Sequence, residues 1–244
     1  MVLEVDEETK EALREALSDM VNPVECLVFI SDNPEECDFC RETVELCKLL
    51  EETSNGKVVV KVFNINRDRE YFLKYNVDRV PSVLLLDGRI RYTGIPAGEE
   101  IKGLVETIVR ISVNESGLLD STVESLRRNL KGKAYVEVIV TPTCPYCPYA
   151  AVLANMFAFM GEGKLIADIV EAIENPDIAD EYGVTAVPTV VVNGHVEFVG
   201  VPQEEDLLVA VLKLQQDEVP IPFHKNHNHK PPKHIHVKEY KSAG

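Results

Sequence analysis

Two Cys-x-x-Cys motifs occupy matching places in two similar halves of this 244-residue chain. Cys37-Asp38-Phe39-Cys40 and Cys144-Pro145-Tyr146-Cys147 begin 107 positions apart, and the same offset links Val80-Pro81 to Val187-Pro188. Further matches at this or nearly this offset are Gly56-Lys57 with Gly163-Lys164, Tyr75 with Tyr182, and Gly94-Ile95-Pro96 with Gly200-Val201-Pro202. Self-similarity at such a period indicates a duplicated domain and not a short-unit solenoid. The chain is therefore expected to fold as two copies of one domain.

Each half is predicted to contain the same order of helices and strands. In the first half we expect helices at residues 12–20, 41–52, 67–75 and 99–113, and strands at 24–30, 57–64, 82–86 and 89–93. In the second half we expect helices at 121–130, 145–160, 177–182 and 204–216, and strands at 135–140, 164–170, 189–192 and 195–199. Asp87-Gly88 and Asn193-Gly194 are hairpin-turn signals. Strands that alternate with helices predict a parallel core, with an antiparallel hairpin at its edge.

Composition and charge exclude several classes of protein. Aliphatic, aromatic and Cys residues make up 45 % of the chain, which is enough for real cores and excludes disorder over most of its length. The formal net charge of −16 argues against binding to nucleic acid or to acidic membrane surfaces. We find no apolar run of membrane-spanning length and no secretory signal at the start, so a cytoplasmic protein is expected.

The order of a strand, a Cys-x-x-Cys that opens a helix, and a Val-Pro before a hairpin resembles the thioredoxin fold. In duplicate, over about residues 1–216, it resembles the protein disulfide oxidoreductases of thermophilic archaea and bacteria. The resemblance implies an α/β fold of two tandem thioredoxin-fold units, each a mixed central sheet flanked by helices. We expect an N-terminal unit at 1–115, a C-terminal unit at 116–216 and a His-rich tail at 217–244. Intracellular disulfides are common in hyperthermophiles, so a thermophilic source would fit.

The chemistry expected from this resemblance is thiol-disulfide exchange that reduces, forms or isomerises protein disulfides. Cys144 and Cys37 are the expected nucleophiles, because unpaired N–H groups at a helix N-terminus favour a thiolate. Cys147 and Cys40 are the expected resolving thiols. The resemblance further implies that Pro188 and Pro81 are cis and present a backbone edge to the substrate, with the preceding Val187 and Val80 flanking the sulfurs. It implies disulfide-containing client proteins, a thioredoxin reductase-like flavoprotein as electron donor, and no cofactor beyond the cysteines.

The two sites are not expected to be equal. Glu35, Glu36 and Asp38 surround Cys37, whereas no acid lies within five residues of Cys144. Negative neighbours disfavour a thiolate, so Cys37 should have the higher pKa and its pair should be the more reducing. We therefore expect the second motif to be the dominant site.

Two acids on the strands before the motifs are candidates for a proton relay. Glu25 precedes Cys37 by twelve residues, and Glu137 precedes Cys144 by seven. The thioredoxin pattern leads us to expect six, so the extra residue could turn Glu137 to the other face of its strand. The alternative is that both are carboxylates at a strand edge or a domain interface.

The remaining cysteines and histidines have simpler expected roles. Cys26 and Cys47 lie in apolar surroundings and are expected to be buried core thiols. A zinc site shared by the two motifs is not expected, because they are more than a hundred residues apart. His227, His229, His234 and His236 form two His-x-His pairs that are weak candidates for metal ligands.

Two other functions remain open at this point. A glutathione-linked glutaredoxin is suggested by Thr143 and the Cys-Pro-Tyr-Cys motif, although Val199 to Glu204 lacks the Gly-Gly and acid cluster that grips glutathione. The non-enzyme alternative is a metal-handling or holdase-like binding protein that works through its His-rich tail.

Overall fold

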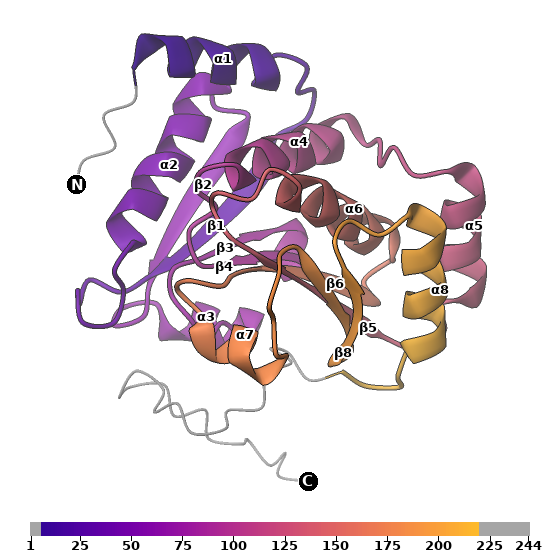
Figure 1. Ribbon diagram of the computed structural model, residues 1–244. Helices are drawn as coiled ribbons and strands as arrows, with labels where there is room; N and C mark the ends of the chain where they lie inside the picture. Colours follow the sequence, from indigo (N-terminus) through magenta and orange to yellow (C-terminus); the bar gives the residue numbers. More distant parts are fainter. Residues whose placement is uncertain (1–5, 220–244) are drawn as a thin grey trace, which may run out of the picture.

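The computed structural model describes residues 6–219, which form two successive sets of helices and strands (Figure 1). The first set is α1 (Glu7–Leu17), β1 (Val24–Ile30), α2 (Cys40–Thr53), β2 (Val58–Asn64), α3 (Arg69–Tyr75), β3 (Ser82–Leu85), the 3-10 turn η1 (Leu86–Gly88), β4 (Ile90–Thr93) and α4 (Glu100–Val113). The second set is α5 (Asp120–Asn129), β5 (Ala134–Val140), α6 (Cys147–Met160), β6 (Leu165–Glu171), α7 (Pro176–Glu181), β7 (Thr189–Val192), β8 (His195–Val199) and α8 (Glu204–Leu214).

The expected elements are all present, and their ends differ from the expected ends by a few residues. The largest difference is in α1, which begins at Glu7 and ends at Leu17 where the pattern predicted 12–20, and α6 begins at Cys147 where the pattern predicted a start at Pro145. Pro148 stands in the first turn of α6, where its missing N–H leaves no helical hydrogen bond unmade. Both hairpin turns are confirmed, because Asp87 and Asn193 have φ angles of 53° and 47°, each followed by a left-handed glycine.

The strands of both units join one continuous sheet, with the order β2-β1-β3-β4-β6-β5-β7-β8. Within each unit the first two strands are parallel and the closing hairpin is antiparallel, as predicted. Each unit has a mixed sheet flanked by helices, as expected. The two sheets are continuous, because β4 of the first unit pairs in parallel with β6 of the second, from Ile90 opposite Ala167 to Thr93 opposite Val170. The predicted boundary after residue 115 falls between α4 and α5.

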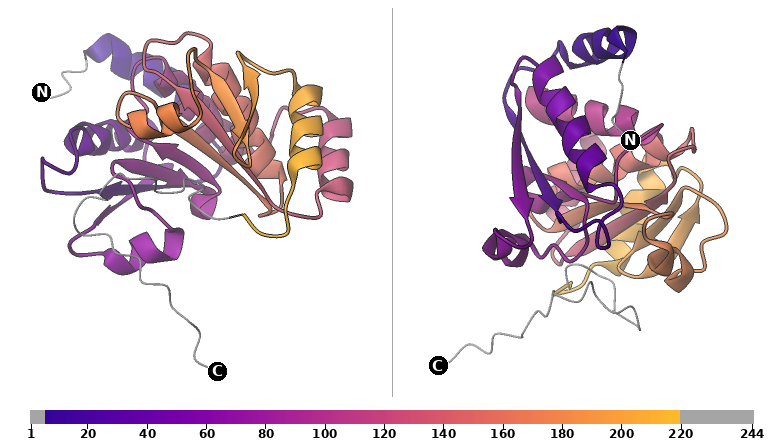
Figure 2. Two further views of the ribbon diagram at one scale, coloured as in Figure 1. Left: turned by 60° about the horizontal axis from the view of Figure 1, so that its bottom comes forward. Right: turned by 90° about the vertical axis from the view of Figure 1, so that its left-hand side faces the viewer.

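The helices cover the two faces of this sheet unequally. Figures 1 and 2 show α2, α4 and α6 on one face, and the short helices α3 and α7 on the other. The main hydrophobic core lies under the first group and draws on both units, with buried residues such as Leu50, Leu104, Val138 and Phe157. α4 therefore packs between its own unit and α6, and the two units share a core as well as a sheet.

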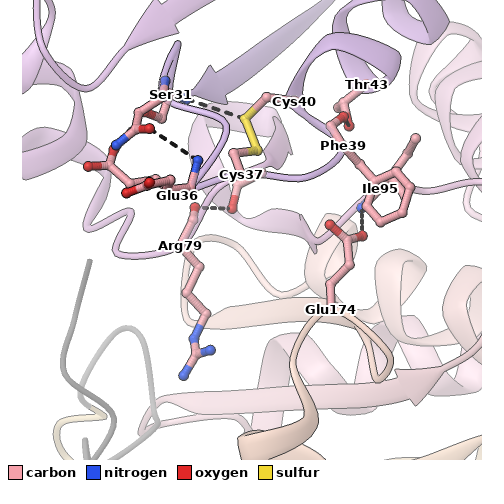
Figure 3. The surroundings of a disulfide bond; sticks show 12 residues. Ser31, Glu36, Cys37, Phe39, Cys40, Thr43, Arg79, Ile95 and Glu174 are labelled. Atoms are coloured by element: carbon pink, nitrogen blue, oxygen red, sulfur yellow. Dashed lines mark hydrogen bonds between the residues drawn. A yellow bond between two sulfur atoms is a disulfide. The ribbon is translucent and has the colours of Figure 1, made fainter. Parts of the chain in front are cut away.

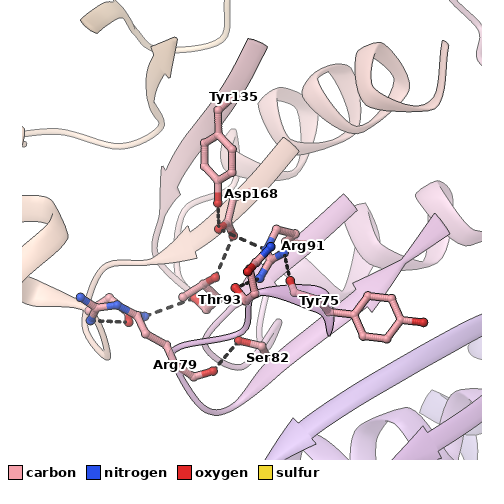
Figure 4. Close-up of polar contacts among 9 residues, drawn as sticks. Tyr75, Arg79, Ser82, Arg91, Thr93, Tyr135 and Asp168 are labelled. Carbon is pink, nitrogen blue, oxygen red and sulfur yellow. Dashed lines mark hydrogen bonds and ion pairs between the residues drawn. The ribbon is translucent and has the colours of Figure 1, made fainter. Parts of the chain in front are cut away.

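A buried polar network ties the units together on the face of α3 and α7 (Figure 4). Arg91 of β4 donates hydrogen bonds to the carbonyl oxygens of Tyr75 and Asn76, and its Nε lies 3.9 Å from Oδ2 of Asp168 in β6. Thr93 Oγ1 and the Tyr135 hydroxyl both donate to Asp168, at 2.8 and 2.6 Å. A carboxylate taken out of water in the middle of the sheet is thus surrounded by donors from both units.

Candidate active sites

Each cysteine pair forms a disulfide at the start of a helix. Cys37 and Cys40 are bonded at the start of α2, and Cys144 and Cys147 at the start of α6, with Cα–Cα distances of 5.6 and 5.5 Å. In both pairs the second cysteine is the first residue of the helix, and the first cysteine precedes it. The first cysteine is also the more accessible, at 8 % against 5 % exposed in the first pair and 7 % against 0 % in the second. This order matches the expected roles of nucleophile and resolving thiol.

The first site opens into a pocket of about 620 Å³ beside Cys37. The pocket is lined by Ile30, Ser31, Asp32, Pro34, Cys37, Asp38, Cys40, Arg41, Glu42, Val44, Glu45 and Lys48. The backbone N–H of Ser31 donates to the sulfur of Cys40 at 3.3 Å, and the Ser31 hydroxyl donates to Glu36 at 2.6 Å. Phe39, between the two cysteines, is 41 % exposed. The first site is therefore an open, acidic site next to an aromatic side chain.

A carboxyl group from the second unit reaches toward one side of this first site. Figure 3 shows Glu174, from the loop between β6 and α7, reaching toward Ile95 and the side of the pair where Phe39 lies. Oε1 of Glu174 accepts a hydrogen bond from the N–H of Ile95 at 2.6 Å. Burial and the nearby charges of Glu171 and Asp38 together raise the pKa of Glu174 to about 7, although the hydrogen bond from Ile95 lowers it. A fourth acid thus joins the three that the sequence placed around Cys37.

The second site has a different electrostatic arrangement around its nucleophile. The backbone N–H of Cys147 donates to the sulfur of Cys144 at 3.1 Å. At the first site a different backbone donor is found, because the N–H of Ser31, in the loop after β1, donates to the sulfur of the resolving Cys40. A donor at a helix N-terminus favours the thiolate that accepts it. Tyr146, inside the second motif, is 66 % exposed and leaves its ring in solvent beside the pair.

The two Val-Pro pairs lie where the resemblance places them, at the entry to β3 and β7. The Val80–Pro81 and Val187–Pro188 peptide bonds are both cis. The carbonyl oxygen of Pro81 accepts from the N–H of Gly94 at 2.9 Å, and that of Pro188 from Gly200 at 2.7 Å. Both prolines are buried, and both valines are half-buried. Each unit therefore has a cis Val-Pro bond in the same place, just before the first strand of its hairpin.

Neither strand acid lies with a cysteine pair, so both proton-relay expectations need correction. Glu25 is at the start of β1, exposed and ion-paired to Lys61 on β2, whereas the first pair lies beyond the other end of β1. Glu137 is fully buried, but side chains alternate along a strand, and its neighbour Val138 is the one in the core with Cys144 and Cys147. Glu137 instead accepts from the Tyr182 hydroxyl at 2.7 Å. Burial raises the pKa of Glu137 well above its ordinary value.

The other two cysteines are buried core thiols, as expected. Cys26 of β1 and Cys47 of α2 are both fully buried, and their sulfur atoms lie 3.8 Å apart. The hydrogen bond with Cys26, together with burial, raises the pKa of the Cys47 thiol well above its ordinary value.

The sequence analysis missed two acids that the fold takes partly or fully out of solvent. Glu174 accepts from the N–H of Ile95, on the side of the first pair where Phe39 lies, and Glu100, at the start of α4, is 1 % exposed. The repeat carries no signal for either, because the residue 107 positions before Glu174 is Arg67 and the residue 106 positions after Glu100 is the exposed Asp206.

In residues 6–219 we find no cluster of His, Cys, Asp and Glu side chains placed to hold a metal ion. The four histidine candidates His227, His229, His234 and His236 lie outside these residues. Over the same range, no helix is both long and apolar enough to cross a membrane.

Comparison with known proteins places this geometry in a family. The family model described as "Thioredoxin domain" matches the chain twice, at residues 28–106 and 134–212, and these two stretches cover more than half of it. The chain belongs to the thioredoxin-domain family. Its two copies each contain one cysteine pair and one cis Val-Pro bond. The chain is therefore a thioredoxin-like oxidoreductase, with its two cysteine pairs as redox centres.

Individual relatives agree with this assignment. A protein disulfide oxidoreductase from Aeropyrum pernix K1 has 49 % identity and a TM-score of 0.82, over 86 % of this chain and 94 % of that one. A thioredoxin from Methanocaldococcus jannaschii is 40 % identical over 81 residues, which are 33 % of this chain and 95 % of the relative. An N-terminal domain of an alkylhydroperoxide reductase from Enterococcus faecalis shares the fold, at a TM-score of 0.75 and 21 % identity over 85 % of this chain and 99 % of that one. These matches lend no support to the glutaredoxin or metal-handling alternatives.

Proposed function

We propose that this thioredoxin-domain protein reduces, forms or isomerises disulfides in client proteins, using Cys37–Cys40 in the first unit and Cys144–Cys147 in the second. The observation that carries the proposal is the repeated arrangement at each site: a disulfide at a helix N-terminus, its first cysteine the more accessible, with a cis Val-Pro bond in the same unit. We assign residues 1–115 and 116–216 to the two units.

The exchange runs in two balanced steps at either pair. In the reducing direction, the thiolate of the first cysteine attacks one sulfur of a client disulfide, forms a mixed disulfide and expels the other client sulfur as a thiolate. The second cysteine loses its proton and attacks the first, which restores the disulfide of the pair and releases the second client sulfur. Two electrons pass from the pair to the client, and a dithiol donor then reduces the pair. The oxidising direction is the reverse.

The second pair is the dominant site in this proposal. Cys144 accepts a helix-terminal N–H, whereas Cys37 lies among Asp38, Glu36 and the Glu174 carboxyl of the other unit. Negative charge near a thiolate raises its pKa, so the first pair should be the more reducing of the two. Pro81 and Pro188, with Val80 and Val187, offer backbone to an extended client segment next to the sulfurs.

The expected setting is the cytoplasm, with a thioredoxin reductase-like flavoprotein as the electron donor. The cysteines themselves carry the electrons, so the proposed cycle needs no further cofactor. A thermophilic source is consistent with the archaeal relatives named above.

The test is dithiothreitol-driven reduction of insulin by the wild type, Cys37→Ser and Cys144→Ser. We expect turnover well above that of the thiol alone, near-complete loss in Cys144→Ser, and retention of most turnover in Cys37→Ser. A variant that lacks residues 217–244 serves as control and should keep wild-type turnover. Wild-type turnover no faster than dithiothreitol alone would refute the function, and equal losses in the two single variants would refute the dominance of the second site.

A further inference from the structure

Arg79 stands immediately before the cis Val80–Pro81 bond of the first site, and its side chain contacts the second unit. Its Nη1 donates to Oδ1 of Asp177 at 3.0 Å and to Oδ1 of Asn175 at 3.3 Å, and its Nη2 donates to Oδ2 of Asp177 (Figure 4). Asn175 and Asp177 lie at the start of α7. The Arg79 and Asp177 side chains are 21 and 27 % exposed. A two-pronged ion pair of this kind fixes the direction of the guanidinium as well as its position.

Asn175 links this ion pair to the end of β4. Its Nδ2 donates to the carbonyl oxygen of Thr93, the last residue of β4, at 3.2 Å, and its side chain is buried. The next residue, Gly94, donates its N–H to the carbonyl oxygen of Pro81. The second unit therefore holds both segments that meet at Pro81, the one that enters β3 and the one that leaves β4.

The order of the strands explains why the second unit lies here. β4 and β6 pair in parallel, so their carboxyl ends lie side by side at one edge of the sheet. β1 and β4 are both antiparallel to β3, so β1 also ends at this edge, and the loop that leads to Cys37 starts there. β3 begins at the same edge, directly after Pro81. The segment between β6 and α7 therefore lies beside the backbone that the proposed function assigns to client binding at the first site.

The second site has the same turn without this anchor. Arg79 corresponds, at the 107-residue offset, to the exposed Ala186, whose methyl side chain cannot form an ion pair. The turn itself is built alike in both units. The Ser82 hydroxyl donates to the carbonyl oxygen of Arg79 at 2.8 Å, and the Thr189 hydroxyl donates to that of Ala186 at 2.7 Å. Local contacts therefore make the turn, and the contact with α7 is an addition at the first site.

Such an anchor matters most to a ligand that binds along the backbone. Ordering a long arginine side chain and withdrawing two charges from water both oppose folding, and the second unit forms its turn without either. A client segment that lies against Pro81 needs the short segment from Arg79 to Pro81 in one conformation. A segment already held in that conformation binds more tightly, because less ordering is left for the binding step.

We propose that Arg79 is a positioning residue for client binding at the first site, set in place by Asp177 and Asn175 of the second unit. The inference rests on the proposed function and adds that the first site depends on side chains from both units. Arg79 acts through the backbone of Val80 and Pro81. Its loss should therefore weaken the binding of an extended peptide and leave the exchange chemistry of Cys37 unchanged.

The experiment measures single-turnover reduction by the first pair in full-length Cys144→Ser/Cys147→Ser protein. The probe is a pair of extended peptides joined by one disulfide, one carrying a fluorophore and the other its quencher, in excess over the reduced protein. We expect Arg79→Met and Asp177→Asn each to raise the half-saturating probe concentration at least about threefold and to leave the limiting rate near that of the wild type. Arg79→Lys, which keeps the charge but not the two-pronged pair, should give a smaller rise.

Two features of the design exclude a simple effect of charge. Arg79→Met removes a positive charge and Asp177→Asn removes a negative one, so a purely electrostatic effect on the probe or on Cys37 would have opposite signs in the two variants. Asp180→Asn, which removes an exposed carboxylate from the same helix, is the matched control and should bind the probe as the wild type does.

Two further measurements separate positioning from a general loss of structure. In the Cys37→Ser/Cys40→Ser background, Asp177→Asn should leave half-saturation at the second pair unchanged, although Asp177 belongs to the second unit. Reduction of hydroxyethyl disulfide, which has no peptide backbone, should proceed at the wild-type rate at the first pair. Unchanged half-saturation at the first pair, an equal rise at both pairs, opposite shifts in Arg79→Met and Asp177→Asn, or equal slowing with hydroxyethyl disulfide would each overturn the proposal. A wild type that reduces neither the peptide probe nor insulin would instead overturn the proposed function itself.

Discussion

Among the residues that connect the two units, Arg91 is the one whose loss should lower the free energy of unfolding most. Its guanidinium is 4 % exposed, bonds to two backbone carbonyls at the end of α3, and faces the buried Asp168 across the β4–β6 pairing (Figure 4). Arg91→Met keeps an apolar stem of similar length but leaves Asp168, which is 1 % exposed, without its cation. Removing one partner of a buried ion pair typically costs about 3–5 kcal/mol, a large part of a domain stability of about 5–15 kcal/mol.

Guanidinium chloride denaturation at pH 7, followed by circular dichroism, measures this loss. The midpoint should fall while the slope stays close to that of the wild type. Arg128→Met is the matched control, because Arg128 is exposed and pairs with Glu124 at 3.5 Å. Its loss should cost less than about 1 kcal/mol. Arg91→Met/Asp168→Asn should recover much of the loss, since no buried charge is then left without a partner. A cost below 1 kcal/mol for Arg91→Met, or no recovery in the double variant, would refute the reasoning.

Two further predictions concern Glu171 and Glu174 of the second unit, which lie against Gly94 and Ile95 of the first. Because the pKa of Glu174 is raised to about 7, its charge is present above that pH and disfavours the Cys37 thiolate there. Glu174→Gln should therefore speed alkylation of reduced Cys37 several-fold at pH 8.5 and leave it unchanged at pH 5.5, and an equal effect at both pH values would contradict this. Gly94→Ala should lower the free energy of unfolding by about 1–3 kcal/mol more than Gly200→Ala, as denaturation curves would report. Both glycines have φ near +99°, but of the two only Gly94 has an atom within contact distance of an added Cβ, the Cβ of Glu171 at 2.7 Å. Equal losses in the free energy of unfolding for the two variants would argue against this contact.

The elements of this fold follow from local pattern. The strand from Val24 to Ile30 was predicted at the bounds that the structure shows. A short run of β-branched and apolar residues between polar turns favours a buried strand over other secondary structure. The two hairpin turns were predictable because Asp-Gly and Asn-Gly accept left-handed backbone. The two cysteine motifs and the two Val-Pro pairs were predictable because the repeat shows each of them twice at the same offset. The cis geometry of the prolines was expected only from the resemblance to the thioredoxin fold, because tertiary context fixes it.

It was harder to predict which face of the sheet each strand side chain occupies. Glu137 lies seven residues before Cys144, and a side chain changes face with every residue along a strand. The count suggested that Glu137 could face away from the cysteines, and the structure shows that Val138 faces them. The length of the loop between strand and motif decides the outcome, and pattern alone does not give the path of a loop.

The sequence by itself determined two copies of a thioredoxin-like unit, their order of elements and the four cysteines of the two redox pairs. Only the tertiary structure decided that β4 and β6 join the copies into one sheet, and that Glu174 of the second unit bonds to Ile95 of the first. The physical reason is the range of the interactions. Helix, strand and turn preferences act between residues a few positions apart, and the repeat doubles that signal. The pairing of two edge strands and a hydrogen bond between loops of different units depend on surfaces that exist only once both units have folded and packed together.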